Sequence, residues 1–113
     1  MSDMLTMTDE EILEKIKSEV GENRVFLYMK GTKDQPMCGF SNQVVQILNH
    51  LDADYEARDI LPDPRIREVL SSWSDWPTIP QLFVDGKLVG GCDIVTEMFQ
   101  AEELKPVIEG SAA

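Results

Sequence analysis

Apolar residues recur at helical spacing in four stretches of the chain. Thr8 and three acidic residues precede an apolar series from Ile12 to Val20, which predicts an N-capped amphipathic helix stopped by Gly21. The same spacing predicts three further helices, at about Gly39–Leu51, at Pro64–Ser74 and from Asp93 onward, the last continuing or restarting near 102–108.

Short apolar runs rich in β-forming residues lie between these stretches. Val25–Met29 fits a buried strand, and Tyr55–Ile60 is a second strand candidate. Gln81–Val84 and Lys87–Gly90 flank Asp85-Gly86, a dipeptide typical of a tight hairpin with a type I′ turn.

The predicted order of elements is therefore α-β-α-β-α-β-β-α. A helix that connects the first two strands implies that they pair in parallel, whereas the hairpin strands must be antiparallel. The pattern thus predicts an α/β fold, with a mixed four-strand sheet and helices on both faces.

Composition and charge narrow the class of protein. The 113 residues suit one small domain, and 42% of them are hydrophobic, which is enough for a core. A formal net charge of −11 disfavours general affinity for nucleic acid or anionic lipid. No apolar run approaches the roughly 20 residues of a membrane span, and the acidic start lacks the features of a targeting segment. We therefore expect a cytoplasmic domain whose tail after Ile108 frays.

The two cysteines, Cys38 and Cys92, are too few for a disulfide scaffold or for a four-thiolate metal site within one chain. Cys38 lies where a loop enters a predicted helix, and a helix N-terminus lowers the pKa of a thiol. The resulting thiolate is both the nucleophile of disulfide exchange and an iron ligand. Ser41, three residues later, cannot close a disulfide with it. An inert, buried Cys38 is the alternative, but its Gly, Pro and polar neighbours indicate a loop tip.

Four short motifs stand in order along the chain: Lys30-Gly31-Thr32, Cys38-Gly39-Phe40-Ser41, Trp76-Pro77-Thr78-Ile79-Pro80-Gln81 and Gly90-Gly91-Cys92-Asp93. Together they closely resemble the monothiol glutaredoxins of the C-G-F-S class. The resemblance implies a thioredoxin-like fold, in agreement with the predicted architecture. It also implies one glutaredoxin domain over residues 1–113, with its core at about 9–108.

The resemblance further implies a groove for glutathione beside Cys38. In it, Lys30 matches the lysine that meets the glycyl carboxylate, and Arg67 matches a second basic contact. Arg65, two positions away, lies on a different side of that helix. The alternative without a function is that Lys30 is an ordinary exposed lysine and Arg67 a solvated arginine on a helix.

Two more motifs complete the groove that the resemblance implies. Ile79 precedes a proline, Pro80, whose peptide bond is cis in the family, and its backbone would pair with the cysteinyl part of glutathione. Cys92 and Asp93 open the last helix, whose N–H groups would meet the γ-glutamyl carboxylate while Asp93 takes the ammonium group. A plain helix N-cap is the alternative role for Asp93.

The resemblance also implies a cargo. A [2Fe–2S] cluster usually takes four sulfur ligands, so two copies of Cys38 and two glutathione thiolates would bridge a homodimer. Storage and transfer of the cluster to apo iron–sulfur proteins is the leading hypothesis, and a BolA-like protein is a possible partner.

Two other functions stay open at this point. Cys38 alone could serve a glutathione-dependent thiol–disulfide oxidoreductase, in which a second glutathione resolves the mixed disulfide. Alternatively, Cys38 and Cys92 could form a redox-sensing disulfide, because only the fold sets their separation.

Four other side chains receive minor roles. We expect His50 on a helix surface or in packing, Trp73 in the core, Trp76 shielding the groove and Phe40 exposed beside Cys38.

Overall fold

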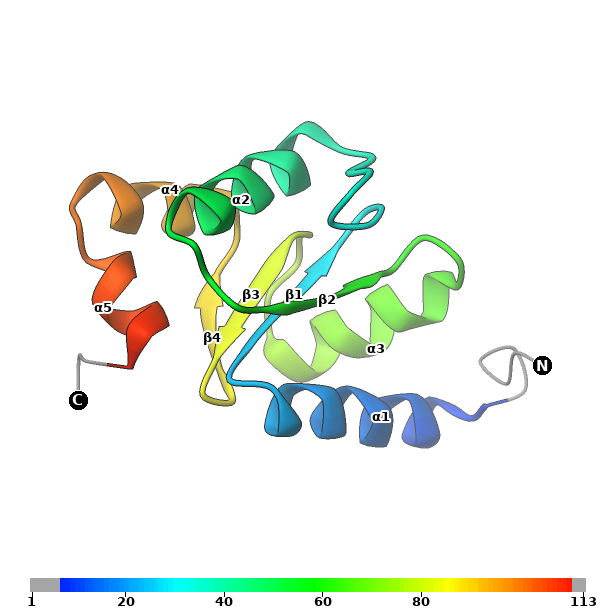
Figure 1. Ribbon diagram of the computed structural model, residues 1–113. Coiled ribbons are helices and arrows are strands. Elements are labelled where there is room, and N and C mark those ends of the chain that lie inside the picture. Colours follow the sequence, from blue (N-terminus) through cyan, green and yellow to red (C-terminus); the bar gives the residue numbers. More distant parts are fainter. Residues whose placement is uncertain (1–6, 111–113) are drawn as a thin grey trace.

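In the computed structural model, which describes residues 7–110, four strands form one mixed sheet with helices on both faces (Figure 1). The elements are α1 (Asp9–Glu22), β1 (Val25–Met29), α2 (Gly39–His50), β2 (Glu56–Asp59), α3 (Pro64–Ser74), β3 (Gln81–Val84), β4 (Lys87–Gly90), α4 (Cys92–Gln100) and α5 (Leu104–Glu109). The strand order is β2-β1-β3-β4, so β1 and β3 occupy the centre. This is the predicted fold class.

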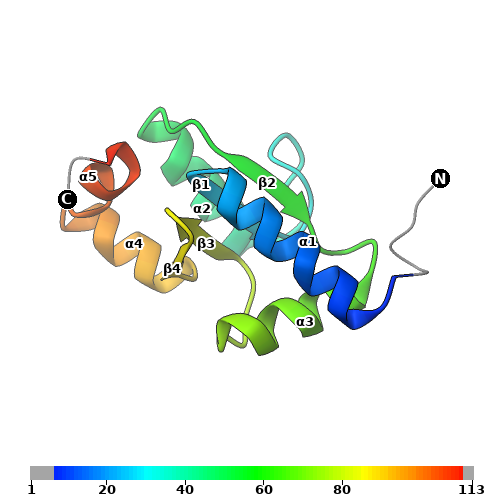
Figure 2. The ribbon, with the colours of Figure 1, turned by 90° about the horizontal axis from the view of Figure 1, so that it is seen from below.

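Strand β1 is buried on both sides, and its side chains alternate between two apolar cores. Val25, Leu27 and Met29 pack in one core with residues of α2, α4 and α5. Phe26 and Tyr28 pack in the other, with α1 and α3. Figure 2 shows α1 and α3 on the near side of the sheet, with α2 behind it. The five-residue apolar run in the sequence is therefore a central strand that contributes side chains to both cores.

The strand pairings follow the expected directions. β1 pairs with β2 in parallel and β3 pairs with β4 antiparallel, while β1 and β3 are also antiparallel neighbours. Asp85 and Gly86 have φ angles of 53° and 80°. Positive φ at both central residues is the requirement of a type I′ turn. The predicted hairpin is thus confirmed.

Several predicted boundaries shift by one or two residues. α1 continues through Gly21 to Glu22, and β2 is confined to Glu56–Asp59. The last helical stretch is divided, because Glu102, with φ 60°, turns the chain between α4 and α5. α5 extends to Glu109.

The first two residues of the tail that we expected to fray, Glu109 and Gly110, belong to the end of α5 in the structure. Glu109 is helical, and Gly110, with φ 77°, forms the left-handed C-cap of α5. Arg24 secures this end, since its guanidinium donates to the carbonyl oxygens of Val107 and Ile108 and pairs with Asp85 in the hairpin turn. The rest of the tail, residues 111–113, lies outside the described residues.

Trp73 is not the core residue that we expected. Its exposed fraction is 36%, and one ring face stacks on Phe83 at a centroid distance of 5.7 Å. The side chain covers the edge of the core beneath α3 instead of entering it.

Within residues 7–110, no helix combines the length and the apolar character needed to cross a membrane.

Candidate functional site

Cys38 is held at the start of α2 by a loop that folds back on the end of β1. The N–H of Met37 donates to the carbonyl oxygen of Lys30 at 2.9 Å, and the N–H of Gly31 donates to Asp59 Oδ1 at 2.9 Å. The buried hydroxyl of Ser41 accepts the N–H of Lys30 at 3.1 Å. These bonds fix the helix start against the sheet. Cys38 is the N-cap residue of α2, and its side chain makes no capping bond.

This position lowers the pKa of the Cys38 thiol below its ordinary value. The largest cause is the backbone N–H of Ser41, and the N–H of Phe40, the charge of Lys30 and the Ser41 hydroxyl act in the same direction. Partial burial opposes them. Free N–H groups at a helix N-terminus stabilise an anion. The expected thiolate character of Cys38 therefore has a structural basis, and its half-buried side chain differs from the buried cysteine of the alternative reading.

The alkylation rate of Cys38 should follow this lowered pKa. In a Cys92→Ala background, the rate with iodoacetamide is expected to rise with pH through a midpoint below the roughly 8.5 of a free thiol. Lys30→Met should move the midpoint upward by a fraction of the total shift, because the N–H groups remain.

The same chain unfolded in urea is the reference for that measurement. Since the pKa is lowered in the folded state, the thiolate stabilises the fold fully above the ordinary pKa, and this contribution is lost as the pH falls through the lowered one. Equal midpoints for the folded and unfolded chains would contradict the assignment.

A groove of roughly 330 Å³ brings the other predicted site residues together, although Cys38 itself is not among the residues that line it. Its lining includes Lys30, Arg67, Ile79, Cys92 and Asp93. Segments that are distant in sequence thus meet at the end of the sheet where β1 stops and β3 begins, as the motifs indicated. Phe40, two residues after Cys38, places the start of α2 beside this groove.

The rest of the lining is Phe40, Trp76, Thr78, Pro80 and Gly91, so Trp76 takes the expected place at the groove. A Cβ atom on Gly91 would lie 3.0 Å from Trp76 Nε1 and 3.2 Å from the carbonyl oxygen of Pro80. Only glycine allows the chain and the indole to approach this closely.

The groove carries side chains of both signs. Arg67 is exposed and lines it, whereas Arg65 is bound to Asp63 and to the carbonyl oxygen of Met7. Of the two arginines, Arg67 is thus the groove residue. Asp93 supplies the opposite charge in the first turn of α4. The N-cap of α4 is Gly91, so the N-cap role considered for Asp93 is wrong.

Gln81 organises the loop that forms one wall of the groove. Its side chain is fully buried, and its Nε2 donates to the carbonyl oxygens of Trp76 at 3.0 Å and Thr78 at 3.2 Å. The Ile79-Pro80 peptide bond, in the same loop just before Gln81, is cis, as the resemblance implied. Sequence reasoning assigned no role to Gln81, although a polar residue that opens a predicted buried strand was a signal of one.

Comparison with known proteins agrees with this geometry. The glutaredoxin family model matches residues 25–89. A probable monothiol glutaredoxin 2 of Rickettsia felis is 47% identical over 104 residues, which cover 92% of this chain and 100% of the relative. The chain belongs to the glutaredoxin family.

Two solved structures extend the comparison. Reduced poplar apo GrxS14 is 45% identical with a TM-score of 0.77, covering 87% of this chain and 90% of that one. A buckwheat glutaredoxin–glutathione complex is 26% identical with a TM-score of 0.81, covering 93% and 94%. Together with its single C-G-F-S cysteine, this likeness identifies a monothiol glutaredoxin with a thioredoxin-like fold.

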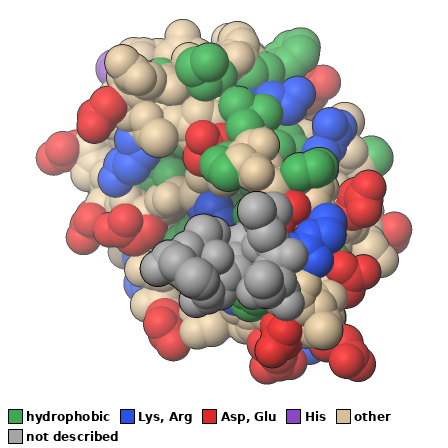
Figure 3. Space-filling model, turned by 90° about the vertical axis from the view of Figure 1, so that its right-hand side faces the viewer, with side chains coloured by type: hydrophobic (Ala, Val, Ile, Leu, Met, Phe, Trp, Pro, Cys, Tyr) green, Lys and Arg blue, Asp and Glu red, His purple; other side chains and the backbone are tan. Residues whose placement is uncertain are grey.

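The surface around Cys38 in this glutaredoxin is hydrophobic as well as charged. Met37 and Phe40, on either side of the cysteine, have exposed fractions of 68% and 64%. The face at the end of the sheet where β1 stops shows a gathering of hydrophobic side chains with Lys and Arg beside it, while acidic side chains surround it (Figure 3).

The glutaredoxin offers few protein ligands for a metal. Among residues 7–110, no three His, Cys, Asp or Glu side chains come together as a metal-binding group. His50 is exposed and packs its ring edge to face with Phe99 at 5.4 Å, in agreement with a surface or packing role. Cys38 and Cys92 are both free thiols. Thiolate sulfur is chemically suited to iron, but the two thiols of one chain are fewer than the four sulfur ligands that a [2Fe–2S] cluster usually takes.

Proposed function

We propose that this glutaredoxin binds glutathione and, as a homodimer, a bridging [2Fe–2S] cluster that it stores and transfers during iron–sulfur cluster assembly. The observation that carries the proposal is the Cys38 thiol, whose lowered pKa favours the ligating thiolate, beside a groove with side chains of both charges. Ser41 cannot turn this thiol into a disulfide, so the thiolate stays available for a metal.

Glutathione suits the groove at four points. It is a tripeptide with a carboxylate at each end and one ammonium group. Lys30 and Arg67 would hold the glycyl carboxylate, and the free N–H groups of the nine-residue helix α4 would hold the γ-glutamyl carboxylate. Asp93 would pair with the ammonium group, and the backbone of Ile79 would pair with the cysteinyl residue. The buckwheat relative, solved as a glutathione complex, supports glutathione as the ligand.

Cys92 lines the same groove, and its Sγ lies 3.9 Å from Thr96 Oγ1. We propose that it contributes its backbone N–H to glutathione. Cys38 of each protomer and one glutathione thiolate per protomer would then make the four sulfur ligands of the cluster. Two of the four are exchangeable small molecules, which suits a cargo that has to be released.

The exposed Phe40 and Met37 would lie in the dimer interface around the cluster. Apo iron–sulfur proteins would receive the cluster, and a BolA-like protein could replace one protomer. A cytoplasmic location fits two free thiols, because the cytoplasm keeps thiols reduced. We also propose that residues 1–113 act as one glutaredoxin domain with its core at about 9–108.

Anaerobic reconstitution tests the proposal. Apoprotein is incubated with iron and sulfide, with and without glutathione, and the absorption spectrum is read together with the elution volume. We expect a coloured dimer only when glutathione is present. Arg67→Gln should raise the glutathione concentration needed by about threefold or more, because one charge-assisted contact is lost. Lys17→Gln, which removes the same charge from the exposed face of α1, should not. Equal uptake without glutathione would contradict the proposal.

Thiol–disulfide exchange is a second candidate function, and the same lowered pKa of Cys38 favours it. In that reaction the Cys38 thiolate attacks the glutathione sulfur of a mixed disulfide and releases the substrate thiol. A second glutathione then attacks the glutathione sulfur of the mixed disulfide on Cys38, which forms oxidised glutathione and releases the Cys38 thiolate. A disulfide-coupled turnover assay separates the functions, because fast turnover without cluster uptake would reverse their ranking.

A further inference from the structure

Helix α2 presents an unusual outer face. Its sequence, GFSNQVVQILNH, contains no Asp, Glu, Lys or Arg, although 27% of the chain is charged. Apart from Gly39 and Phe40 at its start and His50 at its end, the exposed positions along it are amides: Asn42, Gln43, Gln46 and Asn49. A solvent face of a helix normally carries charged residues. Four exposed amides on one helix are therefore a feature that the cysteine chemistry at the helix start does not require.

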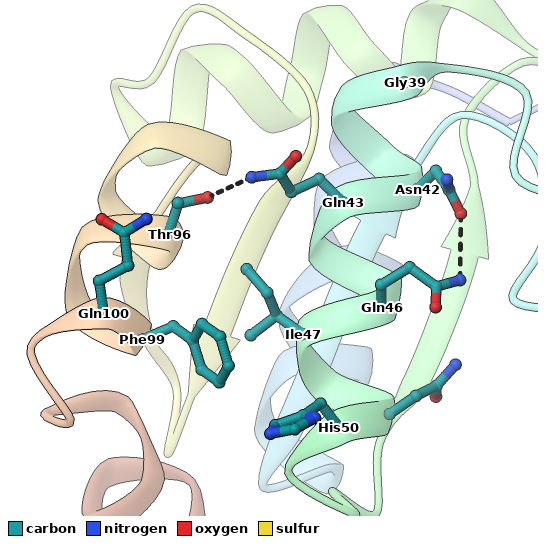
Figure 4. A pocket seen from close by; sticks show the side chains of 10 residues that line it. Gly39, Asn42, Gln43, Gln46, Ile47, His50, Thr96, Phe99 and Gln100 are labelled. Atoms are coloured by element: carbon teal, nitrogen blue, oxygen red, sulfur yellow. Dashed lines mark hydrogen bonds between the residues drawn. The ribbon is translucent and has the colours of Figure 1, made fainter.

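This amide face forms one wall of a groove, and α4 forms the other. The groove has a volume of roughly 730 Å³, and no charged side chain lines it. Figure 4 shows the amide of Gln43 bridging to Thr96 of α4, a bond of 3.1 Å, with Ile47 and Phe99 facing each other below it. The floor is thus apolar and the rims carry amides.

Much of the hydrogen-bonding capacity on these rims is unused. Gln46 Nε2 donates to Asn42 Oδ1 at 3.3 Å, which leaves the Gln46 oxygen available. The side-chain amides of Asn49 and Gln100 have no hydrogen-bond partner in the described part of the chain. Each amide offers both donors and an acceptor, the same pair of groups that a peptide backbone presents.

The groove continues past its lower end into an acidic hollow. His50 and Phe99 line both depressions. The second, of roughly 560 Å³, is also lined by Asp52, Glu102 and Lys105, that is, by two carboxylates and one ammonium group. A ligand that follows the groove would therefore meet net negative charge at its far end.

We propose that the groove between α2 and α4 docks an extended polypeptide segment of a partner protein, with a basic side chain placed in the acidic hollow. The amide rims pair with the backbone of the segment, and Ile47 and Phe99 receive its apolar side chains. The net charge of −11 attracts a basic partner and repels nucleic acid. This surface is separate from the glutathione groove and does not depend on the function proposed above.

The dimensions fit such a segment. α2 has 12 residues, so at about 1.5 Å per residue it is about 18 Å long. An extended chain rises about 3.3 Å per residue, so about five or six residues span the groove. Gly39, which follows Cys38 directly, lines its upper end. A docked segment would hold its parent protein next to the reactive cysteine.

Selection from a phage-displayed library of random heptapeptides tests the proposal on the full-length apoprotein, without iron or glutathione. We expect enriched peptides to carry Lys or Arg and to shift the NMR amide signals of Gln43, Gln46 and Thr96. Gln46→Leu combined with Gln100→Leu should raise their Kd at least about fivefold, through loss of backbone hydrogen bonds. Asp52→Asn, which suits the left-handed φ of 56° at this position, should raise the Kd of basic peptides about threefold.

Gln35→Leu is the matched control, an exposed amide outside the groove, and should leave the Kd unchanged. Circular dichroism confirms that each variant is folded. The proposal is overturned if no peptide is enriched, if enriched peptides lack basic residues, if the double variant binds them normally, or if glutathione displaces them. Because the selection uses apoprotein, its failure leaves the cluster proposal intact, and a failed reconstitution leaves this one intact.

Discussion

A Cys38→Ser variant is expected to keep the fold and to lose all cluster uptake. A serine hydroxyl does not ionise near neutral pH and is not a soft iron ligand, so each protomer loses its protein ligand. Stability should be equal to wild type or higher by up to about 1 kcal/mol, because serine is a preferred N-cap residue and Cys38 makes no capping bond at this position. Anaerobic absorption and thermal denaturation measure the two effects separately.

Cys92→Ser sharpens this experiment. The backbone N–H that we assign to glutathione is retained in this variant, so it should still acquire colour. A colourless Cys92→Ser protein would instead indicate that the Cys92 sulfur is a ligand of the cluster. A Cys38→Ser protein with the iron content of wild type would contradict the proposed ligand set outright.

The architecture could be predicted from sequence because its signals are local. The apolar run at Val25–Met29 and the Asp85-Gly86 turn determine their elements without help from distant residues. The adjacency of β1 and β3 could not be predicted in this way, because strand order depends on how the helical layers cover the sheet. Trp73 illustrates the same limit, since only the position of α3 over Phe83 decides which ring face is buried.

The functional site also has parts that the sequence predicts and parts that only the structure shows. Lys30, Arg67 and Asp93 could be selected from motifs, and the structure gathers them in one groove. The helix start at Cys38 could also be predicted, and with it a lowered pKa of the thiol, but only the structure shows that the Ser41 N–H is the largest cause. The amide groove also required the structure, because its two walls are formed by helices that are about 50 residues apart in sequence.

Gly31→Ala is the second substitution for which we expect a large effect, in this case on stability. Gly31 has a φ of 91°, a conformation that L-residues rarely adopt. A Cβ atom there would lie 2.4 Å from the carbonyl oxygen of Gln35 and 2.6 Å from the backbone nitrogen of Met37. Both contacts are backbone atoms, so the loop before Cys38 would have to move. The left-handed penalty and the overlap together should cost about 3 kcal/mol, measured by urea denaturation.

Gly86→Ala separates the two causes. Gly86 also has a positive φ, 80°, but a Cβ there meets no atom within 4 Å, so only the conformational penalty of about 1 kcal/mol applies. The Gly31 variant should in addition shift the alkylation midpoint of Cys38 toward that of the unfolded chain, since the displaced loop no longer holds the thiol against the Ser41 N–H. The Gly86 variant should not. Equal stability losses in the two variants, or an unchanged Cys38 midpoint in Gly31→Ala, would show that the loop does not position the reactive cysteine.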